Sequence, residues 1–215
     1  MFKSNLILTL IAIIILLIIA LPSQLLFNNP AFQQQLSDYL PAGIHGAILL
    51  FLSITLLTSI GLPRQIGAFI CGYCFDFIFG VMIATLATTV GCWLTFSFAN
   101  KYLEKLVKQY FAKQQHAIYN FLSEQLFYKA IIIRILPLGS NFLTNLIAGA
   151  CQLNAKQFIA GSFFGFMPQM VIFSLAGTGI KLDSSSHLIA SISLFILALL
   201  LSYYLYSKRQ KHASI

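Results

Sequence analysis

The sequence has little charge and very little acid. Of its 215 residues, 8% are charged and 5 are Asp or Glu, whereas 59% are hydrophobic. A soluble domain carries about 25% charged residues, so this chain lacks the polar surface that keeps a domain in solution. Its net charge of +8 does not indicate nucleic acid, because the lysines flank apolar segments and form no basic groove with interleaved aromatics. The composition predicts an integral membrane protein with no nucleic-acid partner.

Residues arranged for catalysis are also scarce. The 4 cysteines all lie in apolar runs, which is poor material for a disulfide framework. Cys71 and Cys74 have redox spacing, so a membrane thiol oxidoreductase is one alternative, and small buried apolar residues are the other. The 4 histidines are far apart, and no hydrolytic constellation, phosphate loop or dinucleotide motif is present. We therefore expect no enzymatic activity, no cofactor and no metal site.

Long apolar runs are the main feature of the sequence. A bilayer core is crossed by about 20 apolar residues. Four segments reach or approach this length, at 6–21, 77–99, 157–180 and 187–207. The first follows Lys3 like a signal peptide, but no A-x-A-like cleavage site comes after it, so we expect an uncleaved anchor.

Two further apolar stretches are each broken by a proline near an arginine. Pro63 and Arg64 interrupt residues 54–73, and Arg134 and Pro137 interrupt residues 129–150. A guanidinium in lipid costs at least ~2.5–3.5 kcal/mol, and a broken backbone ladder cannot be repaired there. These residues must therefore face protein or a wet cavity. Paired broken segments of this kind indicate a transporter-type binding site.

The distribution of lysines predicts the topology. The segment 101–129 holds five lysines, and the tail adds Lys208, Arg209 and Lys211, whereas the loops 27–43 and 181–186 are nearly neutral. Positively charged flanks stay cytoplasmic. Both basic segments fall inside if the chain makes four full spans and each broken unit returns to the side it entered. The predicted fold is an all-α polytopic membrane protein with about four transmembrane helices and two opposed re-entrant hairpins in an inverted repeat.

This reading divides the chain into three parts. They are an anchor with a short outer segment (1–43), a core (44–180), and a C-terminal helix with a basic tail (187–215). The core comprises a hairpin (44–75), a span (77–99), a connector (100–129), a second hairpin (130–152) and a second span (157–180). Whether 44–75 is one hairpin or two short spans is left open. Residues 101–113 alternate apolar and basic side chains at helical spacing, which suits an anionic phospholipid surface; an ordinary connector with lysines as topology signals is the alternative.

Several motifs give the core a family resemblance. They are GLP at 61–63, GYCFDFIFG at 72–80, RILPLGSNFLTNLIAG at 134–149 and FIAGSFFGFMP at 158–168. With these motifs the chain resembles the DedA/VTT-domain (SNARE-associated) membrane proteins, in their Tvp-like branch. The resemblance implies two facing re-entrant hairpins and movement of phospholipids or polyprenyl-phosphate carriers between leaflets. Together with the compact loops it implies a multi-pass protein of a bacterial inner membrane, and the distribution of lysines predicts that both termini are cytoplasmic.

The resemblance also implies roles for single residues. Arg134 matches the family's membrane arginine; Pro137, Asn141, Asn145 and Gly149 match the hairpin turn after it; and Gly165 and Pro168 match the G-x-x-P of the next span. The chain departs from the pattern at the first hairpin. Members that look proton-coupled carry an acid beside the first proline, where this chain has Arg64, and its nearest acid is Asp76.

We predict that the hairpins build a binding site for an anionic headgroup. Arginine grips phosphate bidentately, and asparagine amides and helix N-termini add hydrogen-bonding groups. The predicted headgroup residues are Arg134, Arg64, Asn141 and Asn145. The predicted hairpin-forming residues are Pro63, Pro137, Gly72, Gly149, Gly165 and Pro168, the glycines by close helix packing. Asp76 is the candidate proton-titrating group.

Roles other than binding a headgroup stay open for the same side chains. Arg134 could hold its hairpin closed through carbonyls or an acid, and Arg64 could reach the surface or pair with Asp76. The function we expect is a membrane lipid transporter or scramblase for an anionic lipid. An ion- or proton-coupled small-solute secondary transporter, the thiol oxidoreductase and a structural scaffold are the alternatives. Membrane lipids are the expected partners, and a homo-oligomer is left open.

Overall fold

The computed structural model describes residues 43–135, 140–181, 189–190 and 193–194, without the side chains of 113, 114 and 117. The chain forms two compact units, Met1–Gly46 and Ala47–Ile215, and the elements from Ala47 onward belong to the second. Every element in the described ranges is helical, which confirms the all-α prediction for them. Of the predicted anchor part at 1–43 only Gly43 is described, and Pro137 and most of the predicted helix at 187–215 lie outside the described residues.

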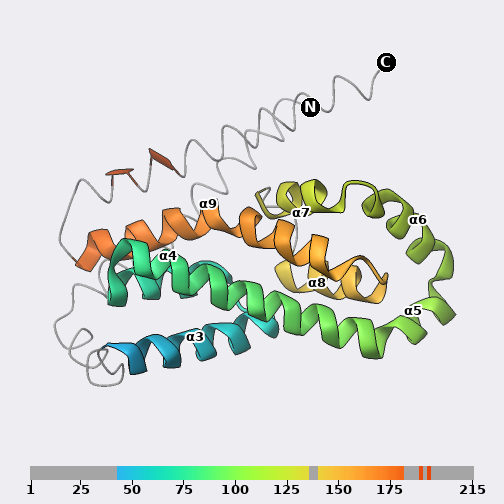
Figure 1. Ribbon diagram of the computed structural model, residues 1–215, viewed down its shortest axis with the longest axis horizontal. Coiled ribbons are helices and arrows are strands. Elements are labelled where there is room, and N and C mark those ends of the chain that lie inside the picture. Colours follow the sequence, from blue (N-terminus) through green and yellow to red (C-terminus); the bar gives the residue numbers. More distant parts are fainter. Residues whose placement is uncertain (1–42, 136–139, 182–188, 191–192, 195–215) are drawn as a thin grey trace, which may run out of the picture. The chain divides into compact units, whose positions relative to one another are not determined.

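The elements follow one another closely (Figure 1). They are α3 (Ile44–Ser59), α4 (Arg64–Phe98), a π-helix (Ala99–Leu103), α5 (Glu104–Tyr110), α6 (Ala112–Ser123), α7 (Leu126–Ile135), α8 (Asn141–Ala150) and α9 (Ala155–Lys181).

Helix α4 is two helices folded against each other. Its backbone leaves helical geometry at Phe75 and Asp76, and Asp76 has φ 65° and ψ 176°. A Cβ atom on Gly80 would lie 2.7 Å from the Cα of Gly72, although a straight helix would separate these residues by about 12 Å. The chain therefore reverses at this break. We call residues 64–74 the short arm and residues 77–98 the long arm.

Helix α3 and the two arms make a first helical triplet. Thr55 on α3 donates to the carbonyl of Ala87 (3.2 Å), and Thr95 donates to the carbonyl of Ser59 (2.8 Å), so α3 and the long arm run parallel. In the sequence the short arm comes between α3 and the long arm, and it runs in the opposite direction to the long arm. A tight turn at Gly61, whose φ of 107° suits glycine, joins it to α3.

Helices α7, α8 and α9 make a second triplet of opposite direction. Gly161 of α9 packs on Phe127, and Gly165 packs on Arg134, so α7 and α9 run parallel. Helix α9 is antiparallel to the long arm, because its start stacks Phe158 on Phe96 and its far part bonds Ser174 to the carbonyl of Phe77. The helix directions in the two triplets are thus opposite. The predicted inverted repeat of two re-entrant hairpins, and the placement of the helices in a bilayer, remain predictions.

Each triplet packs its middle helix against the other triplet. Gly72 of the short arm meets the carbonyl of Ser174 on α9, and Gly149 of α8 meets the carbonyl of Phe96 on the long arm, with no room for a Cβ at either glycine. The turn at Gly61 also meets the start of α8, since a Cβ on Gly61 would lie 3.3 Å from the Cβ of Phe142. The starts of the short arm and of α8 therefore come close together.

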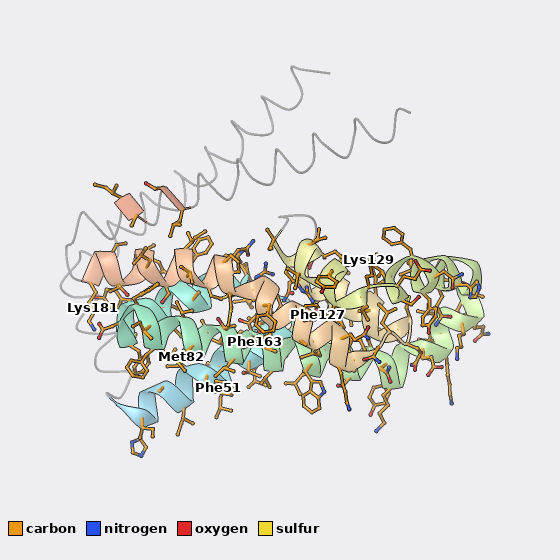
Figure 2. All side chains as sticks on the ribbon, turned by 45° about the horizontal axis from the view of Figure 1, so that its top comes forward. Phe51, Met82, Phe127, Lys129, Phe163 and Lys181 are labelled. Atoms are coloured by element: carbon orange, nitrogen blue, oxygen red, sulfur yellow. The ribbon has the colours of Figure 1, made fainter. Side chains whose placement is uncertain are left out.

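Two stretches of the described residues are long and apolar enough to cross a membrane. The first is Arg64–Tyr110, which the break at Phe75 and Asp76 divides and which includes the long arm, and the second is α9, Ala155–Lys181. Large apolar side chains cover the outside of the long arm, among them Met82, Leu86, Phe98 and Trp93, which is 51% exposed. Figure 2 shows Lys181 at one end of the bundle, far along α9 from Phe127 and Lys129.

Beyond the long arm, the π-helix, α5 and α6 form the connector. None of the described side chains of α5 and α6 is buried. Exposed Tyr102, Leu106 and Tyr110 alternate there with exposed Lys101 and Lys105. The predicted alternation of apolar and basic residues is therefore carried by helices, and Figure 1 shows α5 and α6 extending past α8.

Candidate functional site

Arg134 lies in the last turn of α7 and is 2% exposed. Its Nη1 donates to Oδ1 of Asn141 (2.6 Å), and its Nη2 donates to Oδ1 of Asn145 (2.6 Å). Its Nε donates to the hydroxyl of Ser162 on α9 (3.1 Å). Gly165 makes room for this side chain, because a Cβ there would lie 2.6 Å from the Cβ of Arg134. The sequence-predicted arginine, both asparagines and Gly165 thus lie together.

The two asparagines occupy one face of α8. Asn141 begins the helix and Asn145 follows one turn later, so both side chains point to the same neighbour. Each turns its oxygen to Arg134. In the described part of the chain, the amide nitrogens of both have no hydrogen-bond partner although they are buried. Two buried N–H₂ groups are therefore left over as donors.

Arg64 reaches the same place from the other triplet. It is the first residue of α4, directly after Pro63, and is 9% exposed. Its Nη2 donates to the main-chain carbonyl of Arg134 (3.3 Å) and to Oε1 of Gln169 on α9 (2.6 Å). The guanidinium is thus bound inside the bundle rather than reaching out to its surface.

Two aromatic rings lie against the guanidinium groups of the arginines. The guanidinium carbons of Arg64 and Arg134 each lie 4.9 Å from the ring centroid of Phe166, and that of Arg134 lies 5.1 Å from the ring of Phe158. Cation–π contact lowers the energy of a desolvated guanidinium by up to about 2 kcal/mol. The rings therefore offset part of the desolvation of two like charges, but they supply no negative charge.

No carboxylate balances these two cations within the described residues. The ion pairs found there join Lys181 to Asp76 and Lys108 to Glu104, both on the surface. Both guanidiniums instead bond to neutral oxygens and rings. A buried charge without a counter-charge is expensive, so the site favours a ligand that brings negative charge. We call Arg64, Arg134, Asn141, Asn145, Ser162, Gln169 and Cys92 the arginine cluster.

Cys92, Ser162 and Gln169 were not predicted. The thiol of Cys92, on the long arm, donates to Oδ1 of Asn145 (3.2 Å) and accepts from Nη2 of Arg134 (3.5 Å). Gln169 follows Pro168, which lies inside α9 and cannot donate to the carbonyl four residues back. Ser162 and Gln169 could have been noticed in the sequence as polar residues within an apolar span. The sequence holds no such signal for Cys92.

Asp76 lies at the other end of the short arm, away from Arg64. The alternative of an Arg64–Asp76 ion pair is wrong, because Asp76 pairs with Lys181 (3.1 Å) and Arg64 bonds to Arg134 and Gln169. The Asp76 side chain is 67% exposed, so it is not the buried carboxylate that the proton-titrating role assumed. Lys181 also donates to the carbonyl of Cys74 (3.5 Å), where a cation is favourable at the end of a helical arm.

The C-x-x-C pair lies on the short arm. Cys71 is buried and Cys74 is partly buried, and both are free thiols. Cys71 directly precedes Gly72, which packs tightly on α9, and its side chain is fully buried, as in a packed residue. Among the described residues no cation lies beside Cys71 that would favour a thiolate, whereas Lys181 lies near Cys74.

Comparison with known proteins adds the family. The family model described as the VTT domain matches residues 62–179, which is more than half of the chain. The matched range holds Arg64, Arg134 and both asparagines. The Tvp-like branch is not tested by this match and stays a prediction. Searches of curated proteins and of solved structures gave no match.

Proposed function

The chain belongs to the VTT-domain family, whose members are membrane-associated, and from this premise we propose that it moves an anionic lipid between the leaflets of a bilayer. The proposed step is transfer without covalent chemistry. The observation that carries the proposal is the arginine cluster, in which two buried guanidiniums have neutral partners and no carboxylate among the described residues.

The hydrogen-bond balance of the cluster supports an anion. The oxygens of Asn141, Asn145 and Gln169 already accept from the arginines. The unpaired buried groups are donors, namely Nε of Arg64 and the amide nitrogens of the two asparagines. A ligand that supplies acceptor oxygens and negative charge would satisfy them, and a phosphate ester supplies both.

Helix ends add to this preference. The short arm begins at Arg64 and α8 begins at Asn141, so two helix N-termini lie near the contact between Gly61 and Phe142. The free N–H groups of a helix N-terminus carry partial positive charge. A headgroup would bind at this point inside the bundle, while its chains lie on the exposed apolar side chains of α3 and the long arm.

The test is exchange of a fluorescent anionic lipid in proteoliposomes. Arg134→Gln should abolish exchange, and Arg134→Lys should fail as well, because an ammonium cannot reach Asn141, Asn145 and Ser162 together. Lys105→Gln is the matched control, since it removes a positive charge from the exposed connector. Unchanged exchange in folded Arg134→Gln protein would reject the proposal.

A small-solute secondary transporter is the second candidate, because the unpaired donors would suit any oxyanion. Net flux of a water-soluble anion through proteoliposomes that show no lipid exchange would select it. For either function we propose a bacterial inner membrane with both termini cytoplasmic. The exposed lysines of the connector support its placement on an anionic leaflet there.

A further inference from the structure

Two threonines of the long arm have buried hydroxyls that the arginine cluster leaves unexplained. Thr85 is 2% exposed and Thr88 is fully buried, and neither hydroxyl has a hydrogen-bond partner in the described part of the chain. Their neighbours behave differently: Thr89 donates to the carbonyl of Thr85 (2.7 Å), and Thr95 donates to that of Gly91 (3.0 Å). Buried hydroxyls in proteins almost always have a partner, so the absence of one calls for a ligand or water.

The register of the helices places Thr88 beside the arginine cluster. Thr88 lies one turn before Cys92 on the same face of the long arm, and Cys92 contacts both Arg134 and Asn145. The long arm and α8 run parallel, with Cys92 at Asn145 and Phe96 at Gly149. One turn earlier on both helices, Thr88 comes level with Asn141, whose amide nitrogen is also unpaired.

The same reasoning brings Thr85 to Arg64. Helix α9 is antiparallel to the long arm, with Phe158 at Phe96 and Ser174 near Gly80. Between these two contacts, Thr85 comes level with Gln169, which accepts from Arg64 (2.6 Å). The unpaired Nε of Arg64 and the unpaired hydroxyl of Thr85 therefore lie at one level of the bundle.

We propose that Thr85 and Thr88 are headgroup-binding residues, which together with Arg64, Asn141 and Asn145 donate to a bound oxyanion, either free phosphate or a phosphate ester. The inference rests on the proposed function and extends it. The asparagines of the second triplet hold the anion on one side, and Arg64 and the threonines of the first triplet hold it on the other. The ligand thus bridges the two triplets.

This arrangement also predicts that the site excludes zwitterionic headgroups. All five unpaired groups can donate, and no carboxylate lies in the cluster among the described residues. An ammonium on a zwitterionic headgroup would therefore find no anion to pair with. Phosphatidic acid should bind, whereas phosphatidylcholine should not.

The experiment measures thermal unfolding of the purified full chain. Midpoints are recorded in detergent with increasing inorganic phosphate, and in nanodiscs containing phosphatidic acid or phosphatidylcholine alone. The variants are Thr88→Val and Thr85→Val, which keep the shape and remove the hydroxyl, and Thr88→Ser, which keeps the hydroxyl. Thr89→Val is the matched control, because its hydroxyl is already bonded to the backbone.

We expect Thr88→Val and Thr85→Val to unfold at the wild-type midpoint or above it without anion, because each loses an unpaired buried hydroxyl. Their apparent Kd for the anion should rise at least about tenfold, as for loss of a hydrogen bond to a charged group. Thr88→Ser and Thr89→Val should respond like the wild type. If the wild type responds to phosphatidic acid but not to inorganic phosphate, the site is assigned to the lipid. If it responds to phosphatidic acid and to inorganic phosphate, the site is assigned to the phosphate group itself.

An unaltered anion response in both valine variants would overturn the assignment of the threonines. If Arg134→Gln then still loses the response, the proposed function stands and this inference alone falls. An equal loss in Thr89→Val would also overturn it, since the effect would then belong to the helix rather than to the unpaired hydroxyls. A wild-type protein with no response to either probe would remove the proposed function together with it.

Discussion

The guanidinium of Arg64 donates a hydrogen bond of 3.3 Å to the main-chain carbonyl of Arg134. This bond joins the start of the short arm to the end of α7, so each triplet contributes one side of it. Gln169 of α9 completes the link: its Oε1 accepts from Arg64 (2.6 Å), and its Nε2 donates to the same carbonyl (3.5 Å). The start of the short arm, the end of α7 and the middle of α9 are therefore held together by polar contacts.

The first prediction concerns this link. Arg64→Gln and Gln169→Leu should each lower the free energy of unfolding, and the double variant should lose less than the sum. Contacting residues in one network couple by about 0.5–3 kcal/mol, and each substitution here strands the partner of the other. Denaturant unfolding of the four proteins in detergent gives the coupling energy. Strict additivity would show that the two side chains act independently.

The second prediction concerns glycines on the interlocking arms. Gly72→Ala and Gly149→Ala should each destabilise the protein by about 1–3 kcal/mol, because the added Cβ meets backbone carbonyls that cannot move aside. Gly67→Ala on the same short arm is the control. The three atoms nearest to its added Cβ all belong to the side chain of Ile54, at 3.0 Å or more, so it meets no backbone atom as closely as Gly72 and Gly149 do. Equal losses at Gly67 and Gly72 would contradict the close packing of the arm on α9.

The third prediction concerns the charge of Asp76. Asp76→Asn should lower the free energy of unfolding by at most about 1 kcal/mol, because the ion pair with Lys181 is exposed. It should leave lipid exchange and its pH dependence unaltered. Exchange measured across a pH series in proteoliposomes checks this. A pH dependence that disappears in the variant would restore Asp76 as the proton-titrating group.

The fourth prediction concerns the backbone of the same residue. Asp76 has φ 65° and ψ 176°, a conformation that is almost confined to glycine. Asp76→Gly should therefore raise the free energy of unfolding by about 1 kcal/mol in spite of the lost ion pair. Asp76→Ala loses the same charge without gaining glycine's freedom, so it should not stabilise. Thermal unfolding of the two variants separates strain from charge.

The fifth prediction concerns topology. Single cysteines introduced in the connector, at Lys105, and in the basic tail, at Lys211, should both react with an impermeant thiol reagent from the cytoplasmic side. The background is a variant in which the 4 native cysteines are replaced. Labelling of the two positions from opposite sides would rule out two hairpins that each return to the side they entered.

The sequence predicted local features of the site better than distant ones. The spacing of Arg134, Asn141 and Asn145 on either side of a proline was enough to place them together, because they belong to one hairpin. Cys92 and Ser162 were not predicted, since they reach the cluster from helices far along the chain. The packing of α9 on both arms, which decides those contacts, leaves no periodic signal in a uniformly apolar segment.

The same limit explains the error at Asp76. In the sequence Arg64 is the nearest cation to Asp76 in its own hairpin, and the pairing looked local. The end of α9 instead brings Lys181 to it across the fold, while Gln169 and the carbonyl of Arg134 occupy Arg64. The order of the segments along the sequence could not show that α9 contacts both ends of the short arm.

Trp93 gives the protein an optical probe of its own. It is the single tryptophan of the chain and directly follows Cys92, so it sits at the level of the arginine cluster. Its indole is 51% exposed on the outer side of the long arm. Quenching of its fluorescence by lipids brominated at successive carbons would therefore report how deep below the headgroups the two arginines lie.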